Sequence, residues 1–488
     1  MIAMSELDRF VDDASRVAGI ADVGRRMKAA GVQYIYVQHI TVTGRVVGKG
    51  VPLDQWDDIA RRGVQMVYGS VADLAVDRNG RYLGYPPEAS ELVSVPEPET
   101  YAQLPWDPRV ARVFGRLFRN RDDRIDPGGV LTSDCRGNLA RQHADFRREH
   151  DGLELRVGTE PEMMWLKRDA DGGVRGVTRA NCYHIEQFEA LRQVTLQVIE
   201  YATAMGLEMI QGDHEDAPGQ LELNFNFDDV GRNADRLVTY RQICRQVARE
   251  HGLVATFMAK PFGGVSGSGC HHNISLWHGG EDVVARDTPH TAPAVCTRRT
   301  GGENTFLDAA GSRLPSKMAL HGIGGLLEHL PALTAIGSPT VNSYRRLWDT
   351  GFWAPVRADW GIQNRTCAVR LSAPGRVEYR SVDAMVNPYL MGSALLAALH
   401  DGLNHAIDPG PAQDLSAYDE SDRSGIASRS LPESLGAALA ALAADPVISN
   451  ALPGEMSRVY HEVKRAEWEK FLAVPTAWDI EAYLDFLP

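Results

Sequence analysis

The stretch GSGCHHNISLW, residues Gly267–Trp277, places two adjacent histidines behind a run of small residues. Adjacent side chains on a strand point to opposite faces. His271 and His272 are therefore poor candidates to bind the same metal ion, although the doublet suggests it. We expect one of the two histidines to belong to a functional site. The role of Asn273, the next residue, depends on the rest of the chain.

The length and charge of the chain limit the classes of protein to which it can belong. A chain of 488 residues is too long for one ordinary core, which predicts two domains or more. The formal net charge of −13 argues against a nucleic-acid-binding protein, which needs a basic face. A small anionic substrate remains possible, because clustered arginines can reverse the local field inside a cleft.

The cysteines and the apolar segments predict a cytoplasmic location. The six cysteines are scattered without a C-x-x-C pair, which argues against a zinc knuckle or a disulfide framework. The N-terminal segment MIAMSELDRFVDD is acidic and has no apolar region typical of a signal peptide. The run MGSALLAALHDGL is interrupted by His400 and Asp401, so it predicts a core helix and no membrane span.

Strands and helices alternate along most of the chain. VQYIYVQHITV is a short β-like run before a loop-rich boundary near residue 130, and GLELRVGTEPEMMWLK and LELNFNFDD after it predict strands. FEALRQVTLQVIEYATAMG has helical spacing, with Gly206 as its C-cap. DRLVTYRQICRQVAREHG predicts another helix, with Asp235 near its start and Gly252 at its end. The fold class is therefore α+β or α/β.

Four glutamates form two pairs that could hold cations. Glu160 and Glu162 in GTEPE are two residues apart, so on a strand both carboxylates project from one face. Glu215 and Glu222 flank a Pro-Gly turn in HEDAPGQLELNF and can converge from its two sides. Like charges so close repel unless a cation lies between them or one is protonated. Each pair alone is equally compatible with a solvated surface.

A cluster of arginines around a glutamate indicates phosphate chemistry. Arg376, Glu378 and Arg380 alternate in RLSAPGRVEYRS, with Arg365 and Arg370 just upstream. Buried, these charges would be costly unless a phosphate and a divalent metal bind among them. A surface ladder of salt bridges is the alternative. The chain has no Walker A motif and no G-x-G-x-x-G after a strand, so a nucleotide site must be of another design.

Taken together and in order, several segments resemble the glutamine synthetase family. They are GTEPEMM, HEDAPGQLELNF, ATFMAKPFGGVSGSGCHHNISL, PTVNSYRRL, WGIQNRTCAVRL and GRVEYRSVDAMVNPYLMGSALLAAL. The C-terminal region is most similar to the branch that includes γ-glutamylmethylamide synthetase. The resemblance implies an α+β fold, with an N-terminal β-grasp-like domain over residues 1–134 and a catalytic domain over residues 135–488. In the catalytic domain, an antiparallel sheet flanked by helices forms a funnel. Homo-oligomeric rings, often dodecamers with active sites shared between subunits, are also implied.

The resemblance implies an ATP-dependent ligase that phosphorylates the γ-carboxylate of glutamate and lets an amine displace the phosphate. Acyl-phosphate formation supplies a good leaving group, and divalent ions neutralise the phosphoryl group. Two or more Mg²⁺ or Mn²⁺ ions are expected in each site. One implied metal site consists of Glu162, Glu215 and Glu222, and the other of Glu160, His271 and Glu378.

The resemblance also assigns the substrate and nucleotide contacts. Arg346 matches the clamp for the glutamate α-carboxylate, Arg380 its partner near the γ-carboxylate, and Gly267 a backbone contact to the amino acid. Arg365, Arg370 and Arg376 match positions that hold ATP phosphates or developing negative charge. Ser275 matches a nucleotide-contacting serine. The catalytic residues expected are Arg365, Arg380, Asn273 and Trp353.

Three positions depart from the family pattern. Asn273 replaces the second histidine of His-x-His, which approaches the substrate carboxylate and phosphoryl group, and Asn cannot carry charge. Trp353 stands where the family's flap has a glutamate before Ala-Pro, and Thr41 stands where the N-terminal segment normally supplies an aspartate to the neighbouring site. In glutamine synthetases those two acids bind ammonium and help to remove its proton. The methylamide-forming branch also has the tryptophan but keeps the aspartate.

These departures predict an amine larger than ammonia. Trp353 offers an apolar aromatic wall, and an aromatic amine is already neutral near neutral pH and needs no carboxylate to deprotonate it. An alkyl amine is the other candidate, and Trp353 could also serve only flap packing. A different acid substrate or a non-ligase reaction, such as rearrangement of an aromatic hydroxylamine, is an alternative that Asn273 favours. A regulator that senses amino acid or nucleotide without catalysis is another alternative.

Overall fold

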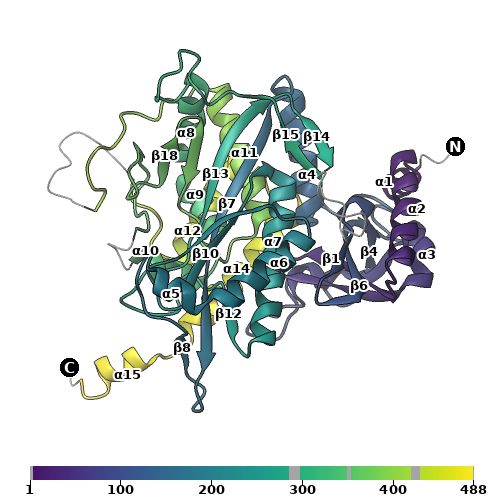
Figure 1. Ribbon diagram of the computed structural model, residues 1–488, viewed down its shortest axis with the longest axis horizontal. Helices are drawn as coiled ribbons and strands as arrows, with labels where there is room; N and C mark the ends of the chain where they lie inside the picture. Colours follow the sequence, from purple (N-terminus) through teal and green to yellow (C-terminus); the bar gives the residue numbers. More distant parts are fainter. Residues whose placement is uncertain (1–3, 285–296, 349–352, 419–428, 487–488) are drawn as a thin grey trace.

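The computed structural model describes residues 4–284, 297–348, 353–418 and 429–486 of the chain. These residues form a small N-terminal sheet with its own helices, and a larger sheet with most of the helices around it (Figure 1). The strands of the larger sheet are almost all antiparallel. The α+β class expected from the sequence is therefore confirmed.

The N-terminal sheet is mixed and has the order β2-β1-β6-β4-β3, with β5 beside β6. The neighbours β1 and β6 run parallel, and helices α2 and α3 pack with them through Ile20, Val23 and Ile59. This parallel pair covered by helices is the β-grasp-like arrangement expected. The elements are α1 (Glu6–Val11), α2 (Ala14–Ala29), β1 (Tyr34–Ile40), β2 (Val46–Pro52), α3 (Trp56–Arg62), β3 (Val64–Val67), β4 (Glu91–Pro96), β5 (Ala102–Leu104) and β6 (Asp107–Arg119).

The larger sheet has the order β17-β18-β19-β13-β7-β10-β9, and only β17 and β18 run parallel in it. Strand β13 contains the histidine doublet and lies between β7 and β19. The strands of this path are β7 (Glu154–Arg168), β9 (Met209–His214), β10 (Gln220–Phe225), β13 (Cys270–His278), β17 (Trp360–Ile362), β18 (Val369–Ala373) and β19 (Arg376–Tyr379). Short strands β8 (Val174–Gly176), β11 (Asp228–Asp229), β12 (Val254–Thr256) and β16 (Glu303–Asn304) extend it, and β14 (Glu281–Val284) pairs with β15 (Thr297–Thr300).

Helices pack around the larger sheet and form its apolar core. Almost all apolar residues of helix α11 are buried, as its sequence predicted. Asn387 caps its start. Within the described residues, no helix is long and apolar enough to cross a membrane. The helices are α4 (Cys135–Glu149), α5 (Ile185–Ala190), α6 (Arg192–Ala204), α7 (Val230–Glu250), α8 (Lys317–Glu328), α9 (Leu330–Gly337), α10 (Val341–Trp348), α11 (Pro388–Asn404), α12 (Leu435–Ala444), α13 (Pro446–Asn450), α14 (Glu455–Leu472) and α15 (Ala477–Tyr483).

Two helices differ from their predicted extent. Helix α7 begins at Val230, five residues before Asp235, because the Asp229 carboxylate accepts hydrogen bonds from the first backbone amides and caps it. The helix predicted around Phe188 is broken at Leu191 into α5 and α6. The domain boundary at residues 134 and 135 stays a prediction, since one apolar core includes Ile40 and Leu117 together with Leu139. The five cysteines in the described ranges are free thiols.

Candidate active site

A cavity of about 1010 Å³ lies on the larger sheet, at strands β7, β10 and β13 and the loops around them. It gathers acidic residues from these strands and the segment before β10, and basic residues from helix α10, from β18 and β19, and from the loops beside these two strands. Most of the residues predicted for a site line it. They are Glu160, Glu162, Glu215, Glu222, Gly267, His271, Arg346, Trp353, Arg365, Arg370, Arg376 and Arg380.

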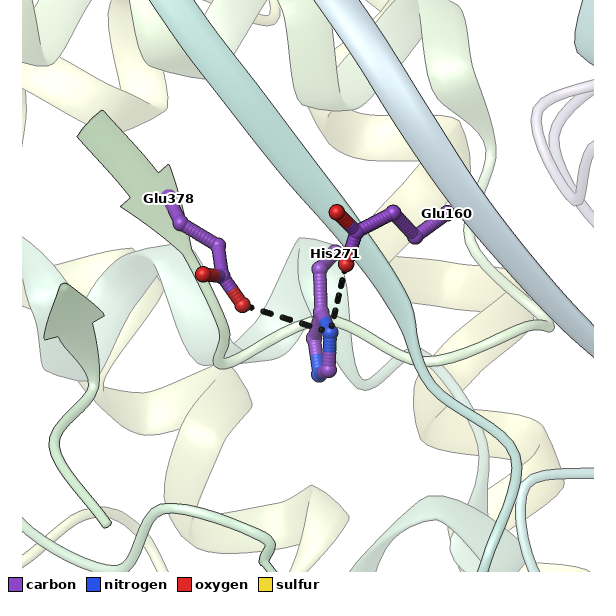
Figure 2. Close-up of side chains that lie close together, drawn as sticks. All are labelled: Glu160, His271 and Glu378. Carbon is purple, nitrogen blue, oxygen red and sulfur yellow. Dashed lines mark hydrogen bonds and ion pairs between the residues drawn. The ribbon is translucent and has the colours of Figure 1, made fainter. Parts of the chain in front are cut away.

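Strand register brings Glu160, His271 and Glu378 together. His271 on β13 lies directly opposite Glu160 on β7, and β19 supplies Glu378 from the other side. Figure 2 shows the imidazole between the two carboxylates, with His271 Nδ1 3.3 Å from Glu160 Oε2 and 3.5 Å from Glu378 Oε1. One ligand atom from each residue lies within 4.8 Å of the others. His272 lies on the opposite face, where its Nδ1 hydrogen-bonds the Cys270 carbonyl at 2.7 Å.

The protonation states of this group suit a divalent cation. Burial, and then the nearby Arg380, hold the pKa of His271 well below its usual value, so the imidazole is neutral. Burial alone would raise the pKa of Glu378, but the charge of Arg380 holds that pKa below its usual range, so the carboxylate is ionised. His271 Nε2 is buried without a hydrogen-bond partner in the described part of the chain. Neutral imidazole and carboxylate oxygens are ligands that Mn²⁺ and Mg²⁺ accept.

The other three glutamates line the same cavity without converging as tightly. Glu222 and Glu162 are direct neighbours on β10 and β7, and the Glu162 carboxylate accepts hydrogen bonds from Gly269 N at 2.9 Å and Gln220 Nε2 at 3.0 Å. Among the described residues, one set of three such side chains, Glu160, His271 and Glu378, has ligand atoms that all lie within 4.8 Å of one another.

Burial and mutual repulsion disfavour the charged forms of these three carboxyls. The pKa of Glu215 is raised to about 8 by burial, then by Glu162. Burial, then Glu160 and Glu162, raise the pKa of Glu222 well above its usual value. Burial likewise raises the pKa of Glu162, although Arg346 opposes the shift. A bound cation would remove this repulsion, so the set fits a second divalent ion.

Gly269 is the point at which the two acidic groups meet. A Cβ at this position would lie 3.0 Å from both Arg346 Nη2 and Glu162 Oε1, and 3.1 Å from His271 Nε2. A Cβ on Gly267 would lie 2.5 Å from the Ala259 carbonyl oxygen. The small residues before the histidine doublet therefore make room for the polar side chains around them.

Two arginines hold Glu378 from different sides. Arg370 Nη1 donates to Glu378 Oε2 at 2.7 Å, and Arg380 Nη1 donates to Oε1. Arg380 Nη2 also donates to the backbone carbonyl of Trp353 at 3.1 Å. Arg346 is 5% exposed, and its Nη1 has no hydrogen-bond partner in the described ranges. The cavity thus has buried guanidinium groups available to an anionic substrate.

Asn273 lies on the same face of β13 as His271, but it is not among the residues that line the cavity. Its Nδ2 donates to Glu160 Oε1 at 2.8 Å, and its Oδ1 accepts from Ser372 Oγ at 3.4 Å. Asn273 is opposite Gly158 on β7, two residues along both strands from the His271–Glu160 pair, and its amide reaches Glu160 from there. The residue therefore positions Glu160.

The remaining predicted residues lie in different surroundings. Trp353 lines the cavity, is 53% exposed and has a positive φ of 63°. Ser275 does not line it, and its Oγ accepts from Trp277 Nε1 at 2.8 Å. Thr41 is fully buried within its own chain, where its Oγ1 accepts from Arg45 N at 3.1 Å and pairs with Thr43 Oγ1 at 2.9 Å.

The sequence did not point to several cavity residues, most of them between β8 and β10 and one, Ser266, just before β13. Tyr183 is 65% exposed with a φ of 61°, and it lies in a turn without periodicity. Burial, then Glu160, raise the pKa of Asp213 to about 6. In the sequence, the acidic residues of GDHED were the only signal that this segment belongs to the cavity. The missed lining residues are Cys182, Tyr183, Gln211, Gly212, Asp213, Asp216 and Ser266.

Comparison with known proteins identifies the family. The sequence pattern described as "Glutamine synthetase, catalytic domain" matches residues 132–302 and 295–483. The chain belongs to the glutamine synthetase family. It is similar to the glutamine synthetase of Pyrococcus abyssi, with 32% identity over 471 residues that cover 93% of this chain and 96% of that protein. The glutamine synthetase of Rhizobium leguminosarum bv. phaseoli is 32% identical over 473 residues, which cover 95% and 99%.

Solved structures agree with this assignment. The GmaS/ADP complex, a γ-glutamylmethylamide synthetase, has a TM-score of 0.81 and 29% identity, covering 95% of this chain and all of that one. Ligand-free GmaS has a TM-score of 0.79 and 28% identity. As a glutamine synthetase family member, this protein is an ATP-dependent carbon–nitrogen ligase, and the predicted family and fold are confirmed. The family uses ATP and divalent metal ions.

Proposed function

We propose that this ligase joins the γ-carboxylate of glutamate to an amine larger than ammonia. The observation that carries the proposal is the position of Trp353, which is half exposed and lines the same cavity as the clustered carboxylates and arginines. An indole ring gives an amine substituent an apolar surface that a carboxylate would not. Both alkyl and aromatic amines fit this chemistry.

We assign the metal-binding residues from the donor sets described above. Glu160, His271 and Glu378 would hold one Mg²⁺ or Mn²⁺ ion, and Glu162, Glu215 and Glu222 a second. Such ions, when bound, supply neutralisation of the negative charge on the transferring phosphoryl group. The neutral His271 and the ionised Glu378 support the first assignment, and the mutual repulsion of the second set supports the other.

The proposed reaction has two steps. An oxygen of the glutamate γ-carboxylate attacks the γ-phosphorus of ATP, which forms γ-glutamyl phosphate and releases ADP. The amine nitrogen attacks the acyl carbon, inorganic phosphate leaves, and the nitrogen loses a proton. Arg346 binds the substrate α-carboxylate beside Gly267, and Arg380 lies near the γ-carboxylate. Arg365, Arg370 and Arg376 stabilise phosphate oxygens, since arginine forks match such oxygens in pairs.

The amine must reach the acyl carbon as a neutral base. In this protein the two positions that hold acids in the family are Trp353 and Thr41, so neither can draw a small cation into the site. An aromatic amine needs no such help, because it is already unprotonated near neutral pH. Homo-oligomeric rings with shared active sites are part of the proposal, and Thr41 and Ser275 keep their proposed substrate and nucleotide roles within it.

The alternatives have less support. Asn273 favours a different acid substrate or a hydroxylamine rearrangement, but its bond to Glu160 supports a role in positioning that carboxylate instead. A regulator without catalysis is disfavoured by membership of a ligase family.

A phosphate-release assay tests the proposal. The full-length protein is incubated with ATP, Mg²⁺ or Mn²⁺, and glutamate, and ammonia, alkylamines and anilines are added in separate reactions. Aspartate in place of glutamate tests the acid. Release stimulated by glutamate together with a larger amine is expected. Best stimulation by ammonia, or product formed without ATP consumption, would contradict the proposal.

A further inference from the structure

A second cavity, of about 400 Å³, lies between the N-terminal sheet and helices α4 and α7. It shares no lining residue with the catalytic cavity. Its walls come from both parts of the chain, including β6, α4, α7 and Tyr389 at the start of α11. Six arginines and four carboxylates line it: Arg112, Arg116, Arg136, Arg147, Arg232, Arg236, Glu97, Glu99, Asp229 and Asp235.

Three of these arginines form ion pairs with acids that do not line the cavity. The pairs are Arg147 with Glu154 at 4.0 Å, Arg232 with Asp282 at 2.9 Å and Arg236 with Asp228 at 2.7 Å. Among the lining acids, Asp229 pairs with His143 at 3.0 Å. Glu99 is exposed where it lines the cavity, and its carboxylate is attracted by Arg116. The balance of charge inside the cavity therefore depends on Arg112, Arg116 and Arg136.

Two carboxylates, Glu97 and Asp235, form ion pairs with Arg116 and Arg136. Neither carboxylate forms an ion pair with Arg112. Arg136 donates to both oxygens of Asp235, at 2.9 and 3.0 Å, and also contacts Glu97. Arg116 pairs with Glu97 at 2.5 Å. Within the described residues, no carboxylate forms an ion pair with Arg112.

Arg112 is a buried charge whose protein contacts are all neutral. It is 6% exposed, and it donates to the Thr100 carbonyl and to Thr239 Oγ1, each at 2.9 Å. Its guanidinium lies 4.2 Å from the centre of the Phe114 ring, and its Nε has no hydrogen-bond partner in the described ranges. The Asp235 carboxylate attracts Arg112 but is already bound by Arg136, so Arg112 has no ion-pair partner of its own in the described part of the chain. A buried charge without such a partner is costly, and a guanidinium binds phosphate or carboxylate oxygens well.

We propose that this cavity binds a small metabolite bearing a phosphate or carboxylate group, for which Arg112 is the buried counter-charge. The ligand would contact the N-terminal sheet through β6 and the catalytic part through α4 and α7. Because it binds the folded chain, it would stabilise the junction between the two parts.

Calorimetry of the full-length protein tests the site, with inorganic phosphate and succinate titrated separately at constant ionic strength. The anion that binds more tightly identifies the headgroup class. Arg112→Gln should weaken this binding about tenfold or more, because a charge-assisted hydrogen bond is lost. Arg109→Gln, the same substitution at an exposed arginine on the same strand that lines neither cavity, should retain it. The proposal is overturned if neither anion binds the wild type, or if Arg112→Gln binds the anion as tightly as the wild type and Arg109→Gln do.

A second measurement needs no variant, in case Arg112→Gln does not fold. Crystals of the wild-type protein soaked in selenate should show anomalous density within hydrogen-bonding distance of Arg112. Density confined to the catalytic cavity would overturn the proposal.

Discussion

Asn273 Nδ2 lies 2.8 Å from Glu160 Oε1, while the other oxygen of the same carboxylate, Oε2, lies 3.3 Å from His271 Nδ1. The amide therefore fixes the rotation of the carboxylate and leaves Oε2 beside the imidazole. Residues that orient a metal ligand in this way commonly change metal affinity 10- to 100-fold when removed, an order-of-magnitude range.

Asn273→Ala should therefore weaken Mn²⁺ binding by about tenfold or more, because Glu160 loses its fixed orientation. Titration followed by electron paramagnetic resonance would measure the affinity. Asn226→Ala is the matched control, since Asn226 makes a similar 3.0 Å bond to Glu208 outside the cavity. Equal Mn²⁺ affinities in both variants would refute the positioning role.

Gly269→Ala should lower both Mn²⁺ affinity and ligase activity, with the free energy of unfolding changed less. The added methyl group would stand about 3 Å from Arg346, Glu162 and His271 and push them apart. Gly263→Ala is the control, because a Cβ there meets nothing within 4 Å. If Gly269→Ala binds Mn²⁺ as the control does, the cavity is less tightly packed than described.

Trp353→Ala should raise the KM for the larger amine about tenfold, because an apolar contact of about 1–3 kcal/mol is lost. The KM for glutamate should change little. Trp348→Ala removes another exposed tryptophan, outside the cavity lining, and serves as the control. An unchanged amine KM in Trp353→Ala would show that the ring only packs the segment.

Arg346→Gln should raise the KM for glutamate by about thirtyfold or more, the equivalent of losing about 2 kcal/mol from a buried charge contact. Its neighbour Arg345 is exposed, so Arg345→Gln provides a control one residue away. Steady-state kinetics with varied glutamate would separate them. A similar KM in both variants would place the α-carboxylate elsewhere.

His329 predicts a pH dependence of stability far from the catalytic cavity. Its Nδ1 lies 2.7 Å from Asp445 Oδ2, and its Nε2 lies 3.1 Å from Asp401 Oδ2. Burial opposes the charge, but the two carboxylates raise the pKa of His329 above its usual value. The stabilisation is therefore complete below the unfolded pKa, which is near 6.5, and is lost as pH rises through the folded pKa.

His329→Gln should accordingly destabilise the protein by about 1–3 kcal/mol at mildly acidic pH and by less at alkaline pH. Urea unfolding at about pH 6 and about pH 9 would measure the difference. His405→Gln is the control, because His405 also pairs with Asp401 but is exposed. A cost that grows with pH would have the wrong sign for this ion pair.

Local patterns were sufficient to predict how several residues of the candidate site are placed. Two-residue spacing placed Glu160 and Glu162 on one face of β7, and alternation separated His271 from His272. The sequence does not encode strand register so directly. The bond between Asn273 and Glu160 requires β13 to pair with β7 so that Gly158 stands opposite Asn273. The start of α7 was misplaced because Asp229, read as the end of a strand, is also the cap of the helix.

Arg380 connects two parts of the cavity, Glu378 and Trp353, for which separate roles are proposed. One guanidinium holds both the Glu378 carboxylate and the Trp353 carbonyl. If an incoming amine shifts the Trp353 backbone, the displacement is transmitted to Glu378 through a single rigid fork. The proposed amine contact at Trp353 and the proposed metal ligand Glu378 are therefore joined through one guanidinium, and a substitution at Arg380 would remove this connection.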